Sequence, residues 1–193
     1  VAFVSDNGRR NKEIWVMEAD GSGKRRVTNN GSINLFPAWS PDGKTLVYTS
    51  FKAGLSELFL LYRGSKPGAR LINSKDKNYR GVWHPTNGRI AAVVARQGNT
   101  DIYSVSGNGS GPVRLTESRS IETSPTFSHD GRRMAFVSDR SGAPQVWIKD
   151  LESGDEHRLT FSGVYNSSTA WSPTGEWIAY AAQAGDNFDI YLI

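Results

Sequence analysis

The segment Gly107-Asn108-Gly109-Ser110-Gly111 is the stretch of this sequence that comes nearest to a catalytic motif. A serine hydrolase places its nucleophile in a Gly-x-Ser-x-Gly turn between a strand and a helix. Here the serine stands in the fourth position, and Pro112 and a strand-like stretch follow it. No Gly-x-Ser-x-Gly pentapeptide occurs anywhere in the chain, so we interpret the segment as a loop and expect no catalytic residue and no enzyme activity.

Phosphate-binding and metal-binding patterns are also weak. Gly23-Lys24 lacks the upstream glycine and the following Ser or Thr of a phosphate-binding loop. The three histidines lie far apart in the sequence, and no carboxylate is spaced to join any of them as a metal ligand: His84, His129 and His157. We therefore expect structural histidines, no metal and no cofactor.

Two groups of charged residues have plausible structural roles. Asp6 and Asp139 follow serines at equivalent places, where an aspartate commonly accepts hydrogen bonds from the backbone of its own loop. Lys24-Arg25-Arg26 is the strongest basic run, in a chain whose net charge is only +4. Nucleic-acid binding would need basic residues clustered with aromatic residues on one surface. We interpret the run as a solvated strand edge and expect no nucleic-acid partner.

The elements that position all these residues repeat every 44 residues. One series of aromatic residues keeps this spacing along the chain: Trp39, Trp83, Phe127 and Trp171. A second, independent series is aliphatic, and an aromatic residue follows each of its members: Ile14, Leu58, Ile102, Val146 and Ile190. A period in the forties, in units made mostly of strands, is typical of β-propeller blades.

Each unit predicts four strands, which we name a to d in chain order. Strand a is short and ends on the repeated aromatic, and a turn such as Ser40-Pro41-Asp42-Gly43 follows it. Strand b, as in 46–49, is apolar on both faces, which favours a sheet covered on both sides. Strand d, as in 70–72, begins with an arginine that suits an exposed outer edge. No segment has a convincing helical period.

The fold class predicted by this pattern is an all-β propeller of four-stranded blades. The chain begins on a strand b and ends on a strand c, which gives about eighteen strands in about four and a half blades. We expect one partial propeller domain over residues 1–193, part of a six-bladed ring, with unpaired edges at 1–4 and 189–193. The chain does not begin with Met, so we expect any targeting signal to lie upstream.

Composition excludes several classes of protein. The chain has no cysteine, which excludes disulfides, thiol catalysis and cysteine-ligated zinc. It has no run of eighteen apolar residues, so we expect no direct membrane insertion. Charged residues make up 22% of the chain, which is normal for a folded domain. We expect a monomer.

Several segments resemble the propeller repeats of the TolB family: residues 13–22, 36–43, 134–142 and 158–168. The resemblance covers essentially the whole chain. It implies a six-bladed propeller and a non-enzymatic, periplasmic protein of the Tol–Pal envelope system, which some colicins also target. It further implies that the lipoprotein Pal docks over one mouth of the propeller channel, and that a separate N-terminal domain contacts the other Tol proteins.

The loops at one end of the propeller are the candidate binding site. In a four-stranded meander, the d–a and b–c loops emerge on one face, and the d–a loops ring the channel mouth. These d–a loops are long and varied, which is typical of binding loops on a fixed scaffold. The candidate partner-binding residues are Asn34, Leu35, Lys77, Asn78, Tyr79, Arg80, Glu122, Thr123, Tyr165 and Asn166.

Among these, we expect Lys77, Tyr79, Arg80 and Thr123 near the centre, since Tyr and Arg are enriched in protein interfaces. The b–c loops are expected to add a mildly basic rim: Arg9, Arg10, Lys12, Lys52, Arg96 and Arg140. A second hypothesis is the gating propeller of a prolyl-oligopeptidase-like serine peptidase whose catalytic domain is absent. A Gly-x-Ser-x-Gly domain in the rest of the protein would favour that hypothesis.

Overall fold

The computed structural model describes residues 1–6, 11–64 and 68–193, and these ranges contain seventeen strands and no helix. The first two sheets are three-stranded: β1 (Ala2–Asp6), β2 (Lys12–Val16), β3 (Arg25–Arg26); β4 (Asn34–Trp39), β5 (Thr45–Ser50), β6 (Glu57–Tyr62). The third has four strands: β7 (Lys77–Trp83), β8 (Arg89–Arg96), β9 (Asn99–Ser106), β10 (Val113–Arg114). The fourth sheet also has four strands: β11 (Glu122–Phe127), β12 (Arg133–Ser138), β13 (Gln145–Asp150), β14 (Glu156–Arg158). The fifth has three: β15 (Asn166–Trp171), β16 (Ile178–Ala184), β17 (Asn187–Leu192).

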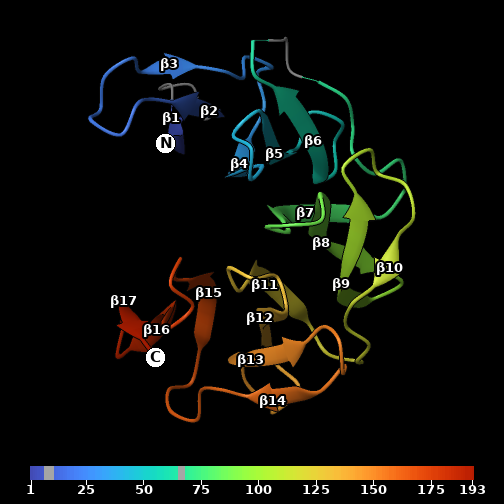
Figure 1. Ribbon diagram of the computed structural model, residues 1–193, viewed down its shortest axis with the longest axis vertical. Coiled ribbons are helices and arrows are strands. Elements are labelled where there is room, and N and C mark those ends of the chain that lie inside the picture. The colour runs from blue at the N-terminus through green and yellow to red at the C-terminus, as the bar shows by residue number, and fades with distance from the viewer. Residues whose placement is uncertain (7–10, 65–67) are drawn as a thin grey trace.

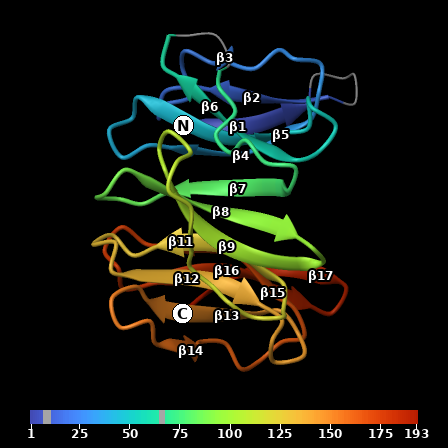
Figure 2. The same cartoon turned by 90° about the vertical axis from the view of Figure 1, so that its right-hand side faces the viewer.

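The five sheets are the predicted blades. Each is an antiparallel meander in chain order. Figure 1 shows them following one another around a common centre as an open arc, with β4, β7, β11 and β15 innermost and β10 and β14 outermost. Figure 2 shows the same sheets stacked along the long axis. The propeller prediction is therefore confirmed.

The strand count differs slightly from the expected eighteen, at the outer strand of the second blade. Residues 70–72 were expected to form this strand, but Arg70 makes only an isolated bridge to Phe59. The backbone N–H of Leu71 still donates to the Leu58 carbonyl at 2.8 Å. The segment thus lies along β6, with too few consecutive pairs to form a ladder.

The inner strands also begin earlier than predicted, because each contains a β-bulge. In the second blade, Leu35 pairs with Thr49 and Ala38 with Val47, so two residues of β4 lie opposite one residue of β5. The same shift recurs in β7, β11 and β15. A bulge lets a strand continue beyond an interruption in its register. Most of the candidate residues therefore lie on strands and not in loops.

Apolar side chains fill the spaces between successive blades. Between the second and third blades, Val47 and Leu58 pack against Ile90 and Ala92. Gly81 allows this approach, because a Cβ atom there would lie 2.8 Å from Cγ2 of Val47. Since the three middle sheets are covered on both faces, their strands b need no polar alternation, as the sequence indicated.

The two ends of the arc have free edges in the part of the chain that the structure describes. There, β1 pairs only with β2, and β17 only with β16. Every residue of β17 is exposed, including Ile190 at 74%. The predicted unpaired edges at 1–4 and 189–193 are thus present. No helix within the described ranges is long and apolar enough to cross a membrane.

His84 links two neighbouring blades and is structural, as predicted. Its side chain is buried, with Nε2 3.0 Å from the carbonyl oxygen of Gly131 and its ring 4.8 Å from that of Phe127. Burial lowers the pKa of His84, and the hydrogen bond to Gly131 opposes this only in part. The neutral imidazole is therefore the form that the fold prefers.

We expect the free energy of unfolding to fall as the pH drops from 7.5 to 5.5. Because the pKa of His84 is lower in the folded state, its contribution is fully present above its unfolded value of about 6.5 and is lost as the pH falls through the folded value. Denaturant unfolding at several pH values measures this. His84→Ser, which installs the residue found at 40, 128 and 172, should flatten the dependence. The exposed His129→Ser control should keep it, and identical slopes in wild type and His84→Ser would contradict the assignment.

Candidate functional site

Four of the ten candidate residues are buried, and the three asparagines among them bond the preceding blade. Asn34, Asn78, Glu122 and Asn166 stand 44 residues apart at the start of each inner strand, and each is at most 1% exposed. Asn34 Nδ2 donates to the Lys12 carbonyl at 3.0 Å, and Asn166 Nδ2 donates to Oε1 of Gln145 at 2.8 Å. Because these four side chains are buried and form hydrogen bonds within the protein, they are not available to contact a partner.

A second buried polar series supports the first, and sequence analysis missed it. Its members begin strand c of the first four blades: Glu13, Glu57, Asp101 and Gln145. In the fourth blade, Thr160 donates to Gln145 Oε1 at 2.8 Å and accepts the Val146 N–H at 2.9 Å. The signal was available, since the series has the 44-residue spacing of the apolar core.

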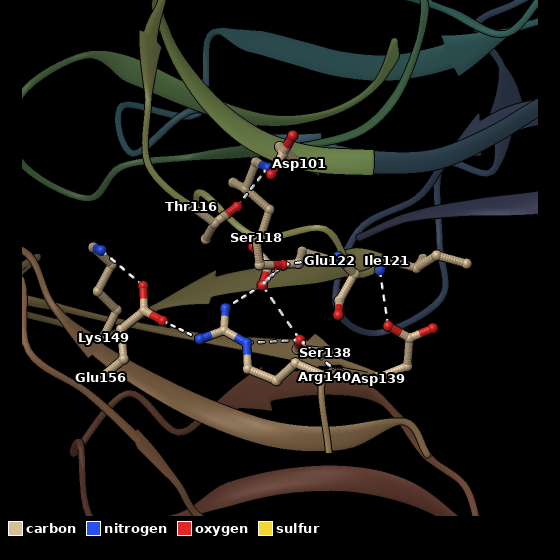
Figure 3. Close-up of polar contacts among 12 residues, drawn as sticks. Asp101, Thr116, Ser118, Ile121, Glu122, Ser138, Asp139, Arg140, Lys149 and Glu156 are labelled. Carbon is tan, nitrogen blue, oxygen red and sulfur yellow. Dashed lines mark hydrogen bonds and ion pairs between the residues drawn. The ribbon is translucent and has the colours of Figure 1, made fainter. Parts of the chain in front are cut away.

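Glu122 departs from the asparagines of its series, and Arg140 compensates for its charge. Arg140 forms ion pairs through Nη2 with Glu122 and through Nη1 with Glu156 (Figure 3). Lys149 Nζ completes the group at 2.8 Å from Glu156. Burial alone would raise the pKa of Glu156, but the hydrogen bonds from Lys149 and Arg140 outweigh it and lower that pKa. Glu122 is completely buried, so its charge depends on Arg140.

Two expectations, one for the rim residue Arg140 and one for the loop residue Asp139, are corrected by the structure. Arg140 was expected on the basic rim, but its side chain is only 21% exposed and its guanidinium lies 4.8 Å from the ring of Trp147. Asp139 was expected to bond its own loop, yet its Oδ1 accepts the backbone N–H of Ile121 from the d–a loop at 2.8 Å (Figure 3). Carboxylate pairing and cation–π packing draw Arg140 inward, whereas Asp139 is held by a backbone N–H of the preceding loop.

Four other candidates converge at the channel mouth. Tyr79 and Arg80 lie on β7, Thr123 on β11 and Tyr165 in the d–a loop before β15, and together they line one pocket of about 440 Å³. Tyr165 is 43% exposed, with its ring edge-on to Phe188 at 5.7 Å. Burial raises the pKa of the Tyr79 phenol, and the neighbouring Arg80 only partly opposes this. A tyrosine- and arginine-lined pocket of this kind is suited to an inserted protein side chain.

The remaining candidates lie at the border of this pocket or outside it. Lys77 is exposed at the start of β7, and Leu35 is half-buried on β4. On the expected rim, Lys12 is exposed, the Lys52 ammonium lies 3.9 Å from the ring centre of Phe59, and Arg96 pairs with Asp76 at 3.7 Å. Arg9 and Arg10 lie outside the described residues.

The basic run at 24–26 is on an outer edge, as expected. Arg25 and Arg26 form the exposed strand β3. Lys24 Nζ lies 5.3 Å from the ring centre of Phe3 and 5.5 Å from that of Trp15. The lysine therefore packs against the blade, in a way that does not favour phosphate binding.

The propeller fold described above agrees with a sequence match to a known family. The sequence matches the family described as "TolB beta propeller domain" over residues 1–193. The chain belongs to this TolB propeller family. Protein TolB homolog of Chlorobium luteolum is 39% identical over 164 residues, which are 80% of this chain and 35% of that protein. The Tol-Pal system protein TolB of Bordetella pertussis is 37% identical over 156 residues, with the same coverage.

Solved structures agree with the TolB assignment. The crystal structure of TolB from Acinetobacter baumannii superposes with a TM-score of 0.85 at 26% identity, covering 99% of this chain and 49% of that one. The crystal structure of puromycin hydrolase superposes with a TM-score of 0.74 at 15% identity, and the match covers 94% of this chain and 31% of the hydrolase chain. At this identity the likeness shows a shared fold alone. The present chain spans about a third of the length of the curated TolB relatives.

Proposed function

We propose that residues 1–193 form a partial propeller domain of a periplasmic, non-enzymatic Tol–Pal protein that binds a partner at the channel mouth. The observation that carries the proposal is the convergence of Tyr79, Arg80, Thr123 and Tyr165 around one pocket. The names of the TolB relatives support the Tol–Pal assignment. The partner that fits best is a Pal-type lipoprotein, with other Tol proteins contacting the rest of the parent protein.

The chemistry of the mouth favours a protein partner. Tyrosine and arginine provide large contact areas with few rotatable bonds, and they dominate the energetics of many interfaces. The exposed residues Lys12, Lys52 and Lys77 place positive charge on the first three blades at this end of the propeller. Such a rim speeds the encounter with an acidic partner and makes the association rate sensitive to salt.

The glycine-rich loop at 107–111 offers no nucleophile within the propeller itself, whereas the alternative, a peptidase-type gating propeller, places its nucleophile in a separate catalytic domain. Ser110 Oγ donates to Asn108 Oδ1 at 2.7 Å within its own turn, and no histidine is among its hydrogen-bond partners in the described chain. A nucleophilic serine needs an adjacent general base. Puromycin hydrolase, which shares the propeller fold, is only 15% identical in sequence to this chain, and this identity is too low for its function to be transferred.

We expect Tyr79→Ala and Tyr165→Ala each to weaken binding of a soluble Pal domain. Loss of a central anchor typically costs about 2 kcal/mol or more, which corresponds to a roughly 30-fold rise in Kd. Titration calorimetry measures the effect. Trp177→Ala is the matched control, because Trp177 is 53% exposed in an a–b turn at the opposite end of the blades.

The control variant tests whether the partner binds at the channel mouth or at the opposite end of the blades. If Trp177→Ala weakens binding as much as the tyrosine variants do, the assigned face is incorrect. The binding experiment is also made with the full-length parent protein, in which the propeller is closed. If this wild-type parent binds no Pal domain at all, the Tol–Pal proposal fails. For the wild-type protein, raising the salt concentration should lower the association rate constant and change the dissociation rate constant much less.

A further inference from the structure

The innermost strands place four residues in one unusual backbone conformation. Phe36, Arg80, Ser124 and Ser168 stand 44 residues apart and have φ values of 53°, 51°, 55° and 55°. Each is the first residue of the bulge in its strand. A non-glycine residue in this region costs about 1–3 kcal/mol, and such strain concentrates at binding sites.

Arg80 connects all four members of this set. Its Nη1 donates to Oγ of Ser124, and its Nη2 donates to Oγ of Ser168 at 3.3 Å. The guanidinium carbon also lies 4.5 Å from the ring centre of Phe36. The side chain therefore reaches from the third blade to the second, fourth and fifth, across the inner face of the arc.

The guanidinium of Arg80 has only neutral acceptors. Within the described residues no carboxylate lies within ion-pair distance of it, and the segments 7–10 and 65–67 contain no Asp or Glu. By contrast, Arg70, Arg114 and Arg140 all pair with acidic residues. Burial lowers the pKa of Arg80, so its charge is poorly compensated where it stands.

The same three polar side chains separate two hollows. Arg80, Ser124 and Ser168 line both the pocket of about 440 Å³ at the mouth and a pocket of about 230 Å³ beside Phe36. Asp139 lines the larger pocket as well, but its Oδ1 already accepts the Ile121 N–H. A ligand can thus reach the guanidinium from the channel.

We propose that Arg80, Ser124 and Ser168 form a binding site for a carboxylate group inside the channel. A guanidinium has five N–H donors, two of which point at the serines, and the serine hydroxyls can rotate to donate to an anion. The planar fork of an arginine can pair with a carboxylate or a phosphate, but a single arginine balances the single charge of a carboxylate and not the roughly doubled charge of a phosphate. The carboxylate is either an acidic side chain of the docked protein, which rests on the proposed function, or a free organic acid.

The test is an NMR titration of the 193-residue protein with sodium propionate, at constant ionic strength. We expect saturable shifts of the backbone amides of Arg80, Ser124 and Ser168, and none with propionamide, its neutral analogue. Arg80→Gln should raise the propionate Kd at least tenfold, and Ser168→Ala about threefold. Arg132→Gln, which removes an exposed arginine from an a–b turn at the opposite end of the blades, should leave it unchanged.

Equal propionate affinity in wild type, Arg80→Gln and Ser168→Ala, or equal shifts with propionamide, would overturn the site. Adding a Pal domain then separates the two sources of the carboxylate. Displacement of propionate assigns the site to a partner side chain, and simultaneous binding assigns it to a free acid. If propionate binds through Arg80 but no Pal domain binds, only the proposed function fails.

Discussion

Replacing Arg140 with methionine should lower the free energy of unfolding by about 3–5 kcal/mol, because it leaves the completely buried Glu122 carboxylate without its cation. Glu156 would keep Lys149 as a partner at 2.8 Å, so the loss is centred on Glu122. Methionine retains most of the apolar stem that packs on Trp147. Denaturant unfolding at pH 7 measures the change.

The matched rescue uses the residue that the other blades carry. Glu122→Asn installs the side chain present at 34, 78 and 166, and it removes the buried charge. The double variant Glu122→Asn/Arg140→Met should therefore recover most of the lost stability, with a coupling free energy of about 2 kcal/mol or more. Additive effects of the two substitutions would show that the ion pair does not stabilise the fold as argued.

Gly109→Ala should destabilise the protein by about 2–5 kcal/mol, the sum of backbone strain and a steric clash. Gly109 has a φ of +82°, and a Cβ atom there would lie 1.7 Å from the Leu71 carbonyl oxygen. This oxygen is backbone of the preceding blade, so it cannot rotate away. Thermal or denaturant unfolding measures the loss.

Gly21→Ala is the control, since Gly21 occupies the same position two repeats earlier. Its φ is +86°, and nothing lies within 4 Å of the added atom. It should cost only the conformational term, about 1–2 kcal/mol. If the two variants lose equal stability, the contact between the third-blade loop and Leu71 contributes nothing.

The blades were predictable because their apolar core repeats. The series through Trp39 and through Ile14 fixed the strand order, and the free edges followed from where the chain enters and leaves the repeat. The bulges were not predictable in this way. A bulge depends on how two strands pair, and its first residue here is a phenylalanine, an arginine or a serine and not the glycine that a left-handed bulge residue usually is.

The candidate site was predicted less well, for a reason that the buried series makes plain. Asn34, Asn78 and Asn166 were assigned to the varied d–a loops because the predicted inner strands began after them, but they recur at one register and are buried. Residues that repeat serve the scaffold, and positions where the repeat changes carry the site. Arg80 is such a position, since Phe36, Ser124 and Ser168 replace it in the other blades.

The four left-handed bulge residues have a consequence for how this channel could diversify. Their backbones are nearly identical, so each presents its side chain from an equivalent place on a different blade. Moving the arginine from 80 to 36, 124 or 168 would turn the charge about the channel axis by one blade at a time, with no change in the strands that support it. The angular position of a ligand group is therefore encoded separately from the fold, in a single residue of each repeat.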